Sequence, residues 1–373
     1  MNDIWNGFYG QENVKEILNN IVESNKIPHA FLFSGKEGVG KDFCAIKFAY
    51  LIYSKLFKND LEIDKKLKSI SSFSEPYIKY IIPLPRGKSE TDVNGPFDKL
   101  DNDDIQLYRE ELNTKISNPY HQIKLPKANN IKINSIRDIK NFLSMNYDDI
   151  PYRIILISDA HTMSDSAQNA LLKNLEEPPE GVIFILTTPF KNQLRETIRS
   201  RCWNINFKPL SNNELKGILK QYYDSDDEVS DRLVPFADGS LSTAIKLLEL
   251  DFDDLLNKTI SILRFSLGRR YNTAYKLVSE IIDKEGTGAF TFLIQMIIFW
   301  LNDVQKYKLN YQEFYFSNHL DTIKKFSENF PSTDINSIAQ SLEDLLLQQK
   351  NNANINILTL SLILKLARVS ILK

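Results

Sequence analysis

The sequence predicts an α/β domain built on a parallel sheet, followed by a helical C-terminal region. Three observations carry this prediction. Up to about residue 210, short apolar runs alternate with amphipathic segments, as in strands and helices that follow one another in a parallel sheet. Beyond that point, apolar residues recur at helical spacing. The glycine-rich stretch GKEGVGKD at 35–42 joins the first apolar run to a helix, as phosphate-binding loops do.

The elements of the α/β part follow from the same pattern. Apolar residues at helical spacing predict a first helix over 14–24 and a second, after the glycine loop, over 41–57. A third helix, over 165–177, is ended by Pro178 and Pro179, because proline lacks the amide hydrogen and clashes with the preceding turn. Short apolar runs predict four buried strands, over 30–35, 152–158, 181–188 and 203–207.

A polar stretch from about 58 to 130 separates the second helix from the second strand. It is rich in Lys, Asp, Asn, Ser and Pro and has little periodicity, so we expect a solvated insertion. Within it, 74–88 and 117–130 share a Ser-x-Pro-Tyr start, and either could supply an extended strand. The acidic segment 95–106 would then be looped out.

The C-terminal region is predicted to be helical. Ser211 followed by Glu214 is a capping-box pattern that starts a helix, and 237–250 is predicted as another helix behind a glycine. Several amphipathic helices follow from about 251, and the last spans 355–372. Its apolar face is broad, which burial in a helical bundle or a subunit interface explains better than a membrane does.

Composition bounds the class of protein. The 373 residues suggest two or three domains, and 42% hydrophobic with 25% charged residues is typical of globular proteins. The net charge of -2 provides no global field toward DNA or an anionic membrane. The start lacks a secretory signal, and the longest apolar run, 292–301, is shorter than the roughly 20 residues of a membrane span, so we expect a cytoplasmic protein. Cys44 and Cys202 are expected to be buried, reduced thiols.

The loop at 35–42 matches the phosphate-binding pattern G-x-x-x-x-G-K but departs from it at the next position. In such a loop, backbone amides around Gly35, Gly38 and Gly40 bind the β-phosphate, Lys41 pairs with phosphate oxygens, and the following hydroxyl ligates magnesium. Here Asp42 stands in that place. A carboxylate about 4 Å from a phosphate charge costs roughly 1 kcal/mol in water and roughly 4 kcal/mol at an effective dielectric of about 20. Asp42 therefore weakens nucleotide binding without forbidding it, and in an empty loop the helix dipole stabilises its charge. Alone, the loop could equally be a structural turn.

Asp159 follows the second predicted strand, at the position where P-loop proteins hold the carboxylate that organises magnesium. Alone it could equally be a helix cap. Ala160 comes next, and its methyl group can neither accept a proton nor orient water, so hydrolysis at this site would lack its base.

Three stretches resemble the clamp-loader branch of the AAA+ proteins: IPHAFLFSGKEGVGKD, SDAHTMSDSAQNALLKNLEEPPEGVIFILTT and TIRSRCW. Within this branch the chain is most similar to the delta-prime family of bacterial DNA polymerase III subunits, and NALLKNLEEPP is the most specific stretch. The likeness covers about 5–57 and 130–250, and the C-terminal helices in pattern only. It implies a RecA-like nucleotide-binding domain over 1–208, a helical lid over 209–250 and a helical collar over 251–373.

The resemblance also implies partners and a role. Members of this branch form a hetero-pentameric ring of tau/gamma-type, delta-type and delta-prime subunits within the DNA polymerase III (nucleotidyltransferase) holoenzyme. The ring uses ATP bound at subunit interfaces to load the sliding clamp onto primed DNA during replication. Arg201 resembles the arginine finger that reaches the ATP of a neighbouring subunit, and a salt bridge to Glu176 or Glu177 is its structural alternative. Thr188 matches the position called sensor one, and a plain strand-end polar group is its alternative.

The departures from the pattern favour a subunit that does not hydrolyse ATP. Active members carry a hydroxyl, a glutamate and an arginine where this chain has Asp42, Ala160 and Ser242. The resemblance therefore implies a stator that donates Arg201 to its neighbour. The alternatives are an active tau/gamma-type ATPase and an inactive AAA+ adaptor not tied to replication, so enzymatic activity of the chain itself stays open.

No metal site is predicted. Many relatives carry a four-cysteine zinc module after the first helix of the nucleotide-binding domain, and this chain has the charged insertion there instead. The histidines do not have a ligand spacing: His29, His121, His161 and His319. We expect no required cofactor, and whether ATP with magnesium binds at the altered loop is left open by the sequence.

Overall fold

The computed structural model describes residues 4–56, 60–144 and 151–369, which divide into two compact units. Unit 1 comprises Met1–Ser230 with Asp238–Ser242, and unit 2 comprises Asp231–Ala237 with Thr243–Lys373. The last residue of the helix predicted over 41–57, the first two of the insertion and 370–372 of the last predicted helix lie outside the described residues. The predicted division into nucleotide-binding domain, lid and collar stays a prediction.

Unit 1 is built on a parallel five-stranded sheet in the order β2-β3-β4-β1-β5. All four predicted strands form, within one residue of their predicted bounds, and a further strand comes from the insertion. The strands are β1 Ala30–Ser34, β2 Ile78–Ile81, β3 Arg153–Ile157, β4 Val182–Thr188 and β5 Trp203–Asn206.

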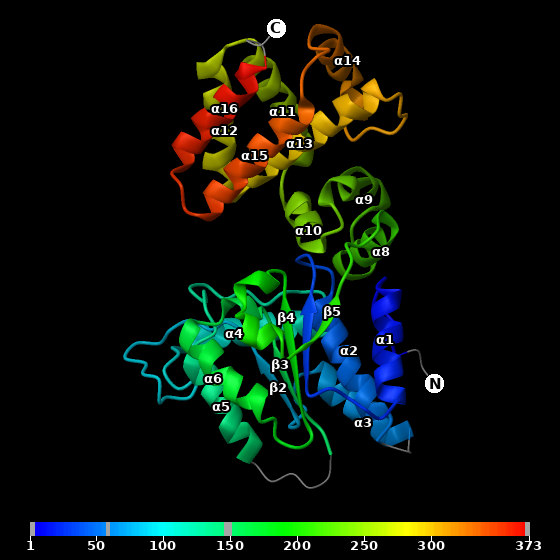
Figure 1. Ribbon diagram of the computed structural model, residues 1–373, viewed down its shortest axis with the longest axis vertical. Coiled ribbons are helices and arrows are strands. Elements are labelled where there is room, and N and C mark those ends of the chain that lie inside the picture. The colour runs from blue at the N-terminus through cyan, green and yellow to red at the C-terminus, as the bar shows by residue number, and fades with distance from the viewer. Residues whose placement is uncertain (1–3, 57–59, 145–150, 370–373) are drawn as a thin grey trace. The chain divides into compact units, whose positions relative to one another are not determined.

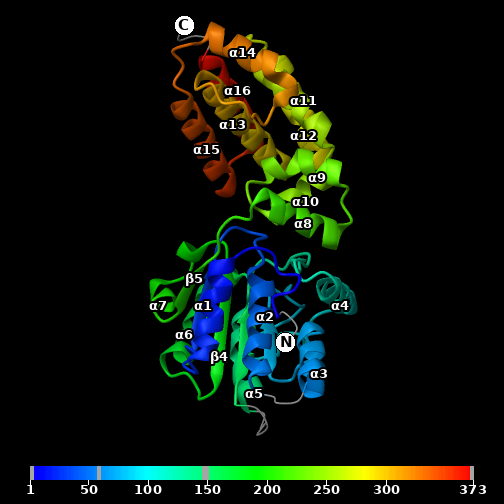
Figure 2. The same cartoon turned by 90° about the vertical axis from the view of Figure 1, so that its right-hand side faces the viewer.

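Helices cover both faces of this sheet, with α1, α2 and α3 on one side and α5 and α6 on the other (Figure 1). Figure 2 shows the same layers with α1 and α2 toward the viewer. The helices of unit 1 are α1 Glu12–Glu23, α2 Lys41–Ser54, α3 Asp60–Ser71, α4 Asn102–Ser117, α5 Ile133–Ser144, α6 Asp165–Glu176, α7 Glu196–Arg199 and α8 Asn212–Tyr223. As predicted, α6 ends before the two prolines, and Ser211 and Glu214 make both hydrogen bonds of a capping box at α8. Two further helices span the boundary between the units: α9 Asp227–Leu233 and α10 Leu241–Glu249.

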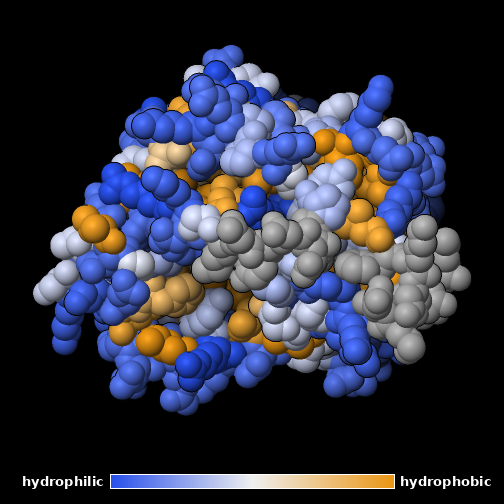
Figure 3. Space-filling view, turned by 90° about the horizontal axis from the view of Figure 1, so that it is seen from below, coloured by the Kyte–Doolittle hydropathy of each residue, from blue (hydrophilic) through white to orange (hydrophobic). Residues whose placement is uncertain are grey.

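The core of unit 1 lies on both faces of the sheet. Strands β1 and β4 are buried along their whole length, which explains why they appear in the sequence as unbroken apolar runs. On one face, Ile139 of α5 and Leu171 of α6 pack in the same cluster as Phe184 of β4. On the other face, the rings of Phe31 and Phe48 meet edge to face with centroids 5.1 Å apart. The face seen in Figure 3 is mostly hydrophilic, with patches of apolar side chains among the polar ones.

The expectation of a solvated insertion over 58–130 is wrong for much of its length. Strand β2 pairs in parallel with β3, and Ile81 joins the core cluster between the sheet and α5. The segment 117–130 forms no strand, and the acidic segment 95–106 contains the start of α4, which the Asp101 side chain caps through the Asp104 amide at 2.8 Å. Strand β2 lies within 74–88, one of the two stretches that could supply an extended strand, but a four-residue strand gives too short an apolar run to predict that the insertion joins the sheet.

Unit 2 is a helical bundle, as predicted from the spacing of its apolar residues. Helix α13 lies at its centre and contacts α11, α12, α14 and α15. Trp300 of α13 is buried against Phe326 of α14, with ring centroids 5.0 Å apart. Its helices are α11 Phe252–Leu267, α12 Tyr271–Glu285, α13 Gly288–Lys308, α14 Leu320–Asn329, α15 Ile335–Lys350 and α16 Ile355–Arg368. Within the ranges that the structure describes, no helix has both the length and the apolar character that a membrane span requires.

Candidate functional site

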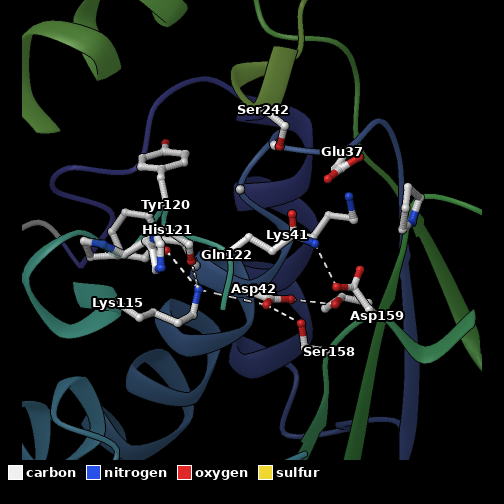
Figure 4. A pocket seen from close by; sticks show the side chains of 16 residues that line it. Glu37, Lys41, Asp42, Lys115, Tyr120, His121, Gln122, Ser158, Asp159 and Ser242 are labelled. Carbon is white, nitrogen blue, oxygen red and sulfur yellow. Dashed lines mark hydrogen bonds and ion pairs between the residues drawn. The ribbon is translucent and has the colours of Figure 1, made fainter. Parts of the chain in front are cut away.

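A pocket of about 50 Å³ lies where the glycine loop meets the carboxyl ends of β3 and β4. This is where open parallel sheets bind their ligands. Residues of four segments line it: the loop with the start of α2, the ends of the two strands, the stretch 115–122 of the insertion, and Ser242 (Figure 4). A pocket of this size has room for a few water molecules between the groups that line it.

The glycine loop is held in place by two close approaches. Gly38 and Gly40 have φ angles of 78° and 87°, in the left-handed region that favours glycine. A Cβ on Gly40 would lie 2.9 Å from ring atoms of both Phe8 and Tyr120. A Cβ on Gly38 would lie 2.3 Å from the Ser242 backbone nitrogen. The loop therefore has the glycines of a phosphate-binding loop, with protein side chains and backbone packed against two of them.

Lys41 is turned back onto its own loop. Its ammonium donates to the backbone oxygens of Gly35 at 3.0 Å and of Lys36 at 2.6 Å. The side chain is 8% exposed, and burial lowers the pKa of this ammonium despite the opposing effect of Asp42 and Asp159. The group that would pair with phosphate oxygens is thus satisfied by backbone carbonyls.

Asp42 is enclosed by donors. Its carboxylate accepts hydrogen bonds from Ser158 and Thr187, both at 2.5 Å, and from the Tyr80 hydroxyl at 3.2 Å. The Lys115 ammonium lies 4.0 Å from Asp42 Oδ2. Both carboxylate oxygens are therefore engaged by the protein at the position where the family pattern has a magnesium-binding hydroxyl.

Asp159 lies beside this cluster at the end of β3, in a left-handed conformation with φ of 50°. Its Oδ2 accepts from Gln122 Nε2 at 2.8 Å. Burial, together with the charge of Asp42, raises the pKa of Asp159 to about 6. Ala160 is fully buried in the core, so the group following Asp159 packs and offers no proton acceptor.

The structure brings most of the predicted nucleotide-site residues together. On β4, the residue that lines the pocket is Thr187, next to the predicted Thr188. Gly38, Gly40, Lys41, Asp42 and Asp159 line the pocket, and the Gly35 carbonyl holds Lys41. Thr188 is fully buried, and its hydroxyl accepts from the Phe190 amide at 3.0 Å, whereas the neighbouring Thr187 lines the pocket and binds Asp42.

Sequence reasoning missed the contribution of the insertion. Tyr80, Lys115, Tyr120 and Gln122 all contact the loop or its carboxylates, yet they belong to a stretch without a recognisable motif. These four residues do not belong to a segment with strong apolar periodicity either. A hint was available in the aromatic residues of the two Ser-x-Pro-Tyr stretches, since exposed insertions seldom need large aromatic side chains.

Arg201 lies outside the lining of this pocket. It follows α7, immediately before β5, and its guanidinium pairs with Glu176 at 2.9 Å and donates to the Thr197 carbonyl at 2.9 Å. The salt-bridge alternative is thus present in this conformation. Both partners are partly exposed, at 34% and 48% of the side chain, and such surface pairs contribute about 0–1 kcal/mol.

A magnesium-bound triphosphate does not fit the residues as they are arranged here. Asp42 and Lys41 are satisfied within the protein, and Tyr120 and Ser242 pack closely against Gly40 and Gly38. Among residues 4–56, 60–144 and 151–369, no three His, Cys, Asp or Glu side chains come together in a way that could hold a metal ion.

Fold and site together define the class: a P-loop domain on a parallel α/β sheet, joined to a helical bundle. Comparison with family models identifies the family within that class. Residues 10–211 match the family model described as DNA polymerase III, delta subunit, and residues 255–368 match the model of its C-terminal part. The chain belongs to this family, in the clamp-loader branch of DNA polymerase III subunits.

Two relatives that are DNA polymerase III subunits agree with the clamp-loader assignment. The chain is 26% identical over 321 residues to DNA polymerase III subunit tau of Bacillus subtilis, covering 80% of this chain and 49% of that protein. It is 29% identical over 245 residues to the gamma subunit of Buchnera aphidicola from Schizaphis graminum, covering 64% of this chain and 56% of the relative. The chain thus spans about half the length of these two relatives. Among solved structures, a gamma subunit-related protein of Thermotoga maritima aligns over 95% of this chain and 99% of its own at 16% identity, with a TM-score of 0.39.

Proposed function

We propose that this chain is a delta-prime-like stator of the DNA polymerase III clamp loader. In this role it hydrolyses no ATP itself and requires no cofactor. It supplies Arg201 to the ATP site of a neighbouring tau/gamma-type subunit in a hetero-pentameric, cytoplasmic assembly with a delta-type subunit. The assembly places the sliding clamp on primed DNA.

The observation that carries this proposal is the state of the site around Asp42. A hydrolytic site needs a hydroxyl to bind magnesium, a free lysine for phosphate and a base for water. Here the corresponding carboxylate is enclosed by three hydroxyls, Lys41 is held by carbonyls, and Ala160 is buried in the core. Asp42 and Ala160 stand in place of two of these groups, and the third, Lys41, is engaged by its own loop.

The position of Arg201 supports a role in trans. Its guanidinium is partly exposed and lies outside the pocket of its own chain, so it is accessible to a second subunit. Exchanging a surface ion pair with Glu176 for contact with a γ-phosphate gives up little stability, since such pairs contribute about 0–1 kcal/mol. Its planar, permanent charge suits phosphate oxygens.

The surface of unit 2 offers a place for assembly. Ile357, Leu360 and Leu364 recur at helical spacing on α16 and are 66%, 48% and 50% exposed. Leu347 of the neighbouring helix α15 is also exposed, at 58%. Apolar side chains that share one helix face and remain exposed are typical of subunit contacts. We assign this face to neighbouring clamp-loader subunits.

Two alternatives make different predictions. The relatives named tau and gamma favour an active ATPase of that type as the second candidate. An adaptor unrelated to replication is disfavoured, because both parts of the chain match a DNA polymerase III family.

ATP turnover by the purified chain separates the stator from the ATPase. We expect phosphate release from ATP and magnesium to equal that of a Lys41→Ala control. Brisk turnover that disappears in Lys41→Ala would overturn the proposal and favour the tau/gamma-type enzyme. Co-purification with a tau/gamma-type subunit in a stoichiometric complex is the corresponding test of partnership, and its failure would favour the adaptor.

A further inference from the structure

The insertion brings a buried cation to the carboxylates of the P-loop site. Lys115 lies on α4 and is 2% exposed, and its ammonium is 4.0 Å from Asp42 Oδ2. Burial lowers the pKa of the Lys115 ammonium, and the negative charges of Asp42 and Asp159 oppose that shift. Figure 4 shows the Lys115 side chain directed toward Asp42. Burying such a charge without a partner is costly, so the ammonium and the carboxylates stabilise one another.

The same ammonium fixes the turn that follows α4. It donates to the backbone oxygens of His121 at 2.6 Å and of Pro119 at 3.4 Å. This turn carries Tyr120, whose ring lies against Gly40, and Gln122, which donates to Asp159. One side chain therefore ties together α4, the turn and the loop carboxylate.

The oxygen atoms around this position have the chemistry of a hard-cation site. Carboxylate and hydroxyl oxygens of Asp42, Ser158 and Thr187 are in mutual contact, and Asp159 lines the same pocket. Magnesium prefers oxygen ligands of this kind, with carboxylates and waters. A lysine ammonium supplies positive charge at the same place but has no coordination position to offer a phosphate.

We propose that Lys115 takes the place of the divalent cation, so that the segment 102–122 occupies the nucleotide site from within the chain. The inference deepens the stator function, on which it rests. A subunit whose loop is kept ordered by its own cation needs no bound nucleotide to present its surface to a neighbour. The alternative is that Lys115 stabilises the fold only through the packing of its aliphatic stem. In that case an uncharged side chain of similar length would stabilise the fold equally well.

The test measures thermal unfolding of the full chain with and without millimolar magnesium chloride, at matched ionic strength. Lys115→Met keeps the stem and removes the charge. We expect its melting temperature to fall by on the order of 5 °C, because the buried carboxylates lose their cation. Magnesium should then restore at least about half of this loss by binding the native state, and it should shift the unaltered chain by less than about 1 °C.

Two further variants define the site. The double variant Lys115→Met with Asp42→Asn should lose the response to magnesium, since a proposed ligand is gone. Lys115→Gln keeps a donor for the His121 carbonyl and removes the charge, so it should show the magnesium response even if Lys115→Met fails to fold.

An unchanged melting temperature in Lys115→Met, or equal magnesium stabilisation of the unaltered chain, would overturn the inference. If neither Lys115 variant folds, calorimetric titration of the unaltered chain with magnesium decides: saturable binding overturns the inference, and heats of dilution alone support it. These results are independent of ATP turnover. The stator proposal can therefore be contradicted while the role of Lys115 as an internal cation is supported, and the reverse is also possible.

Discussion

At the scale of single residues, the site is governed by how its carboxylates are compensated. Asp42 is surrounded by donors, while the Asp159 carboxylate accepts a hydrogen bond from Gln122 and lies near the charge of Asp42. The raised pKa of Asp159 is therefore a statement about stability as well as about the site. A carboxyl whose pKa is higher in the folded than in the unfolded chain stabilises the fold when protonated and loses that contribution as the pH rises through the folded value.

Asp159→Asn should raise the stability of unit 1 above about pH 6. The ordinary pKa of an aspartate is about 3.9, so the contribution of Asp159 decreases by about 1 kcal/mol between about pH 5 and pH 7.5. An asparagine can keep the contact with Gln122 and does not ionise. Melting temperatures of the two chains across this range test the expectation. At the alkaline end, the melting temperature of the variant should be higher than that of the parent. Parallel curves would show that Asp159 does not titrate there.

At the scale of elements, the insertion is the part of the fold that the sequence least revealed. Strands β1, β3 and β4 are covered on both faces, so they leave continuous apolar runs that are easily recognised. Strand β2 lies at the edge of the sheet, where Ile78, Lys79 and Tyr80 are only half-buried, and it leaves no such run. It forms a strand because it pairs with β3, which lies more than seventy residues further along the chain. The local spacing of apolar residues does not reveal such a long-range pairing.

The same limit applies to the candidate site. The glycine loop and Asp159 were predictable because their chemistry requires fixed residue types at fixed spacing after a strand. Lys115 and Gln122 were not, since a lysine and a glutamine on polar segments are ordinarily solvated, and only the fold brings them to the loop. Thr187 lines the pocket and was not predicted, because only the alternation along β4 decides which of two adjacent threonines faces the pocket, and the role of Thr188 stays a prediction.

Ile81→Ala tests whether the insertion is integral to unit 1. Ile81 is 4% exposed and packs in the cluster shared by the sheet and α5, so truncation should lower the free energy of unfolding by roughly 2–5 kcal/mol. Val93→Ala is the matched control in the same insertion, because Val93 is 92% exposed and should change stability by less than about 0.5 kcal/mol. Denaturant unfolding of both variants gives the comparison. Equal, small effects would mean that β2 contributes little to the fold.

At the scale of the whole molecule, the proposed function divides the work between the two units. Unit 1 carries the P-loop site and Arg201, while unit 2 carries the exposed apolar face of α16. Since Lys41 and Asp42 are engaged by groups of unit 1 itself, the contribution of this chain to a clamp loader would lie in the surfaces and the cation that it offers to other subunits.

Leu360→Glu should impair assembly without unfolding the chain. Leu360 is half-exposed on α16, so a charge there costs little in the isolated protein and opposes burial against a neighbour. We expect an unchanged melting temperature and loss of stoichiometric co-purification with a tau/gamma-type subunit. Leu309→Glu, at an exposed position after α13, is the control and should assemble normally. Full assembly of Leu360→Glu would assign the contact to another surface.

The most direct measurement is the DNA-stimulated ATPase rate of the reconstituted complex containing Arg201→Ala. An arginine finger is worth roughly 10³–10⁵ in rate at the site it serves, so we predict a lower rate with unchanged folding and assembly. Arg195→Ala is the matched control, because Arg195 is also a partly exposed arginine, paired with Asp165 at 3.0 Å, and it should leave the rate unaltered. A complex that keeps its full ATPase rate with Arg201→Ala would contradict the account.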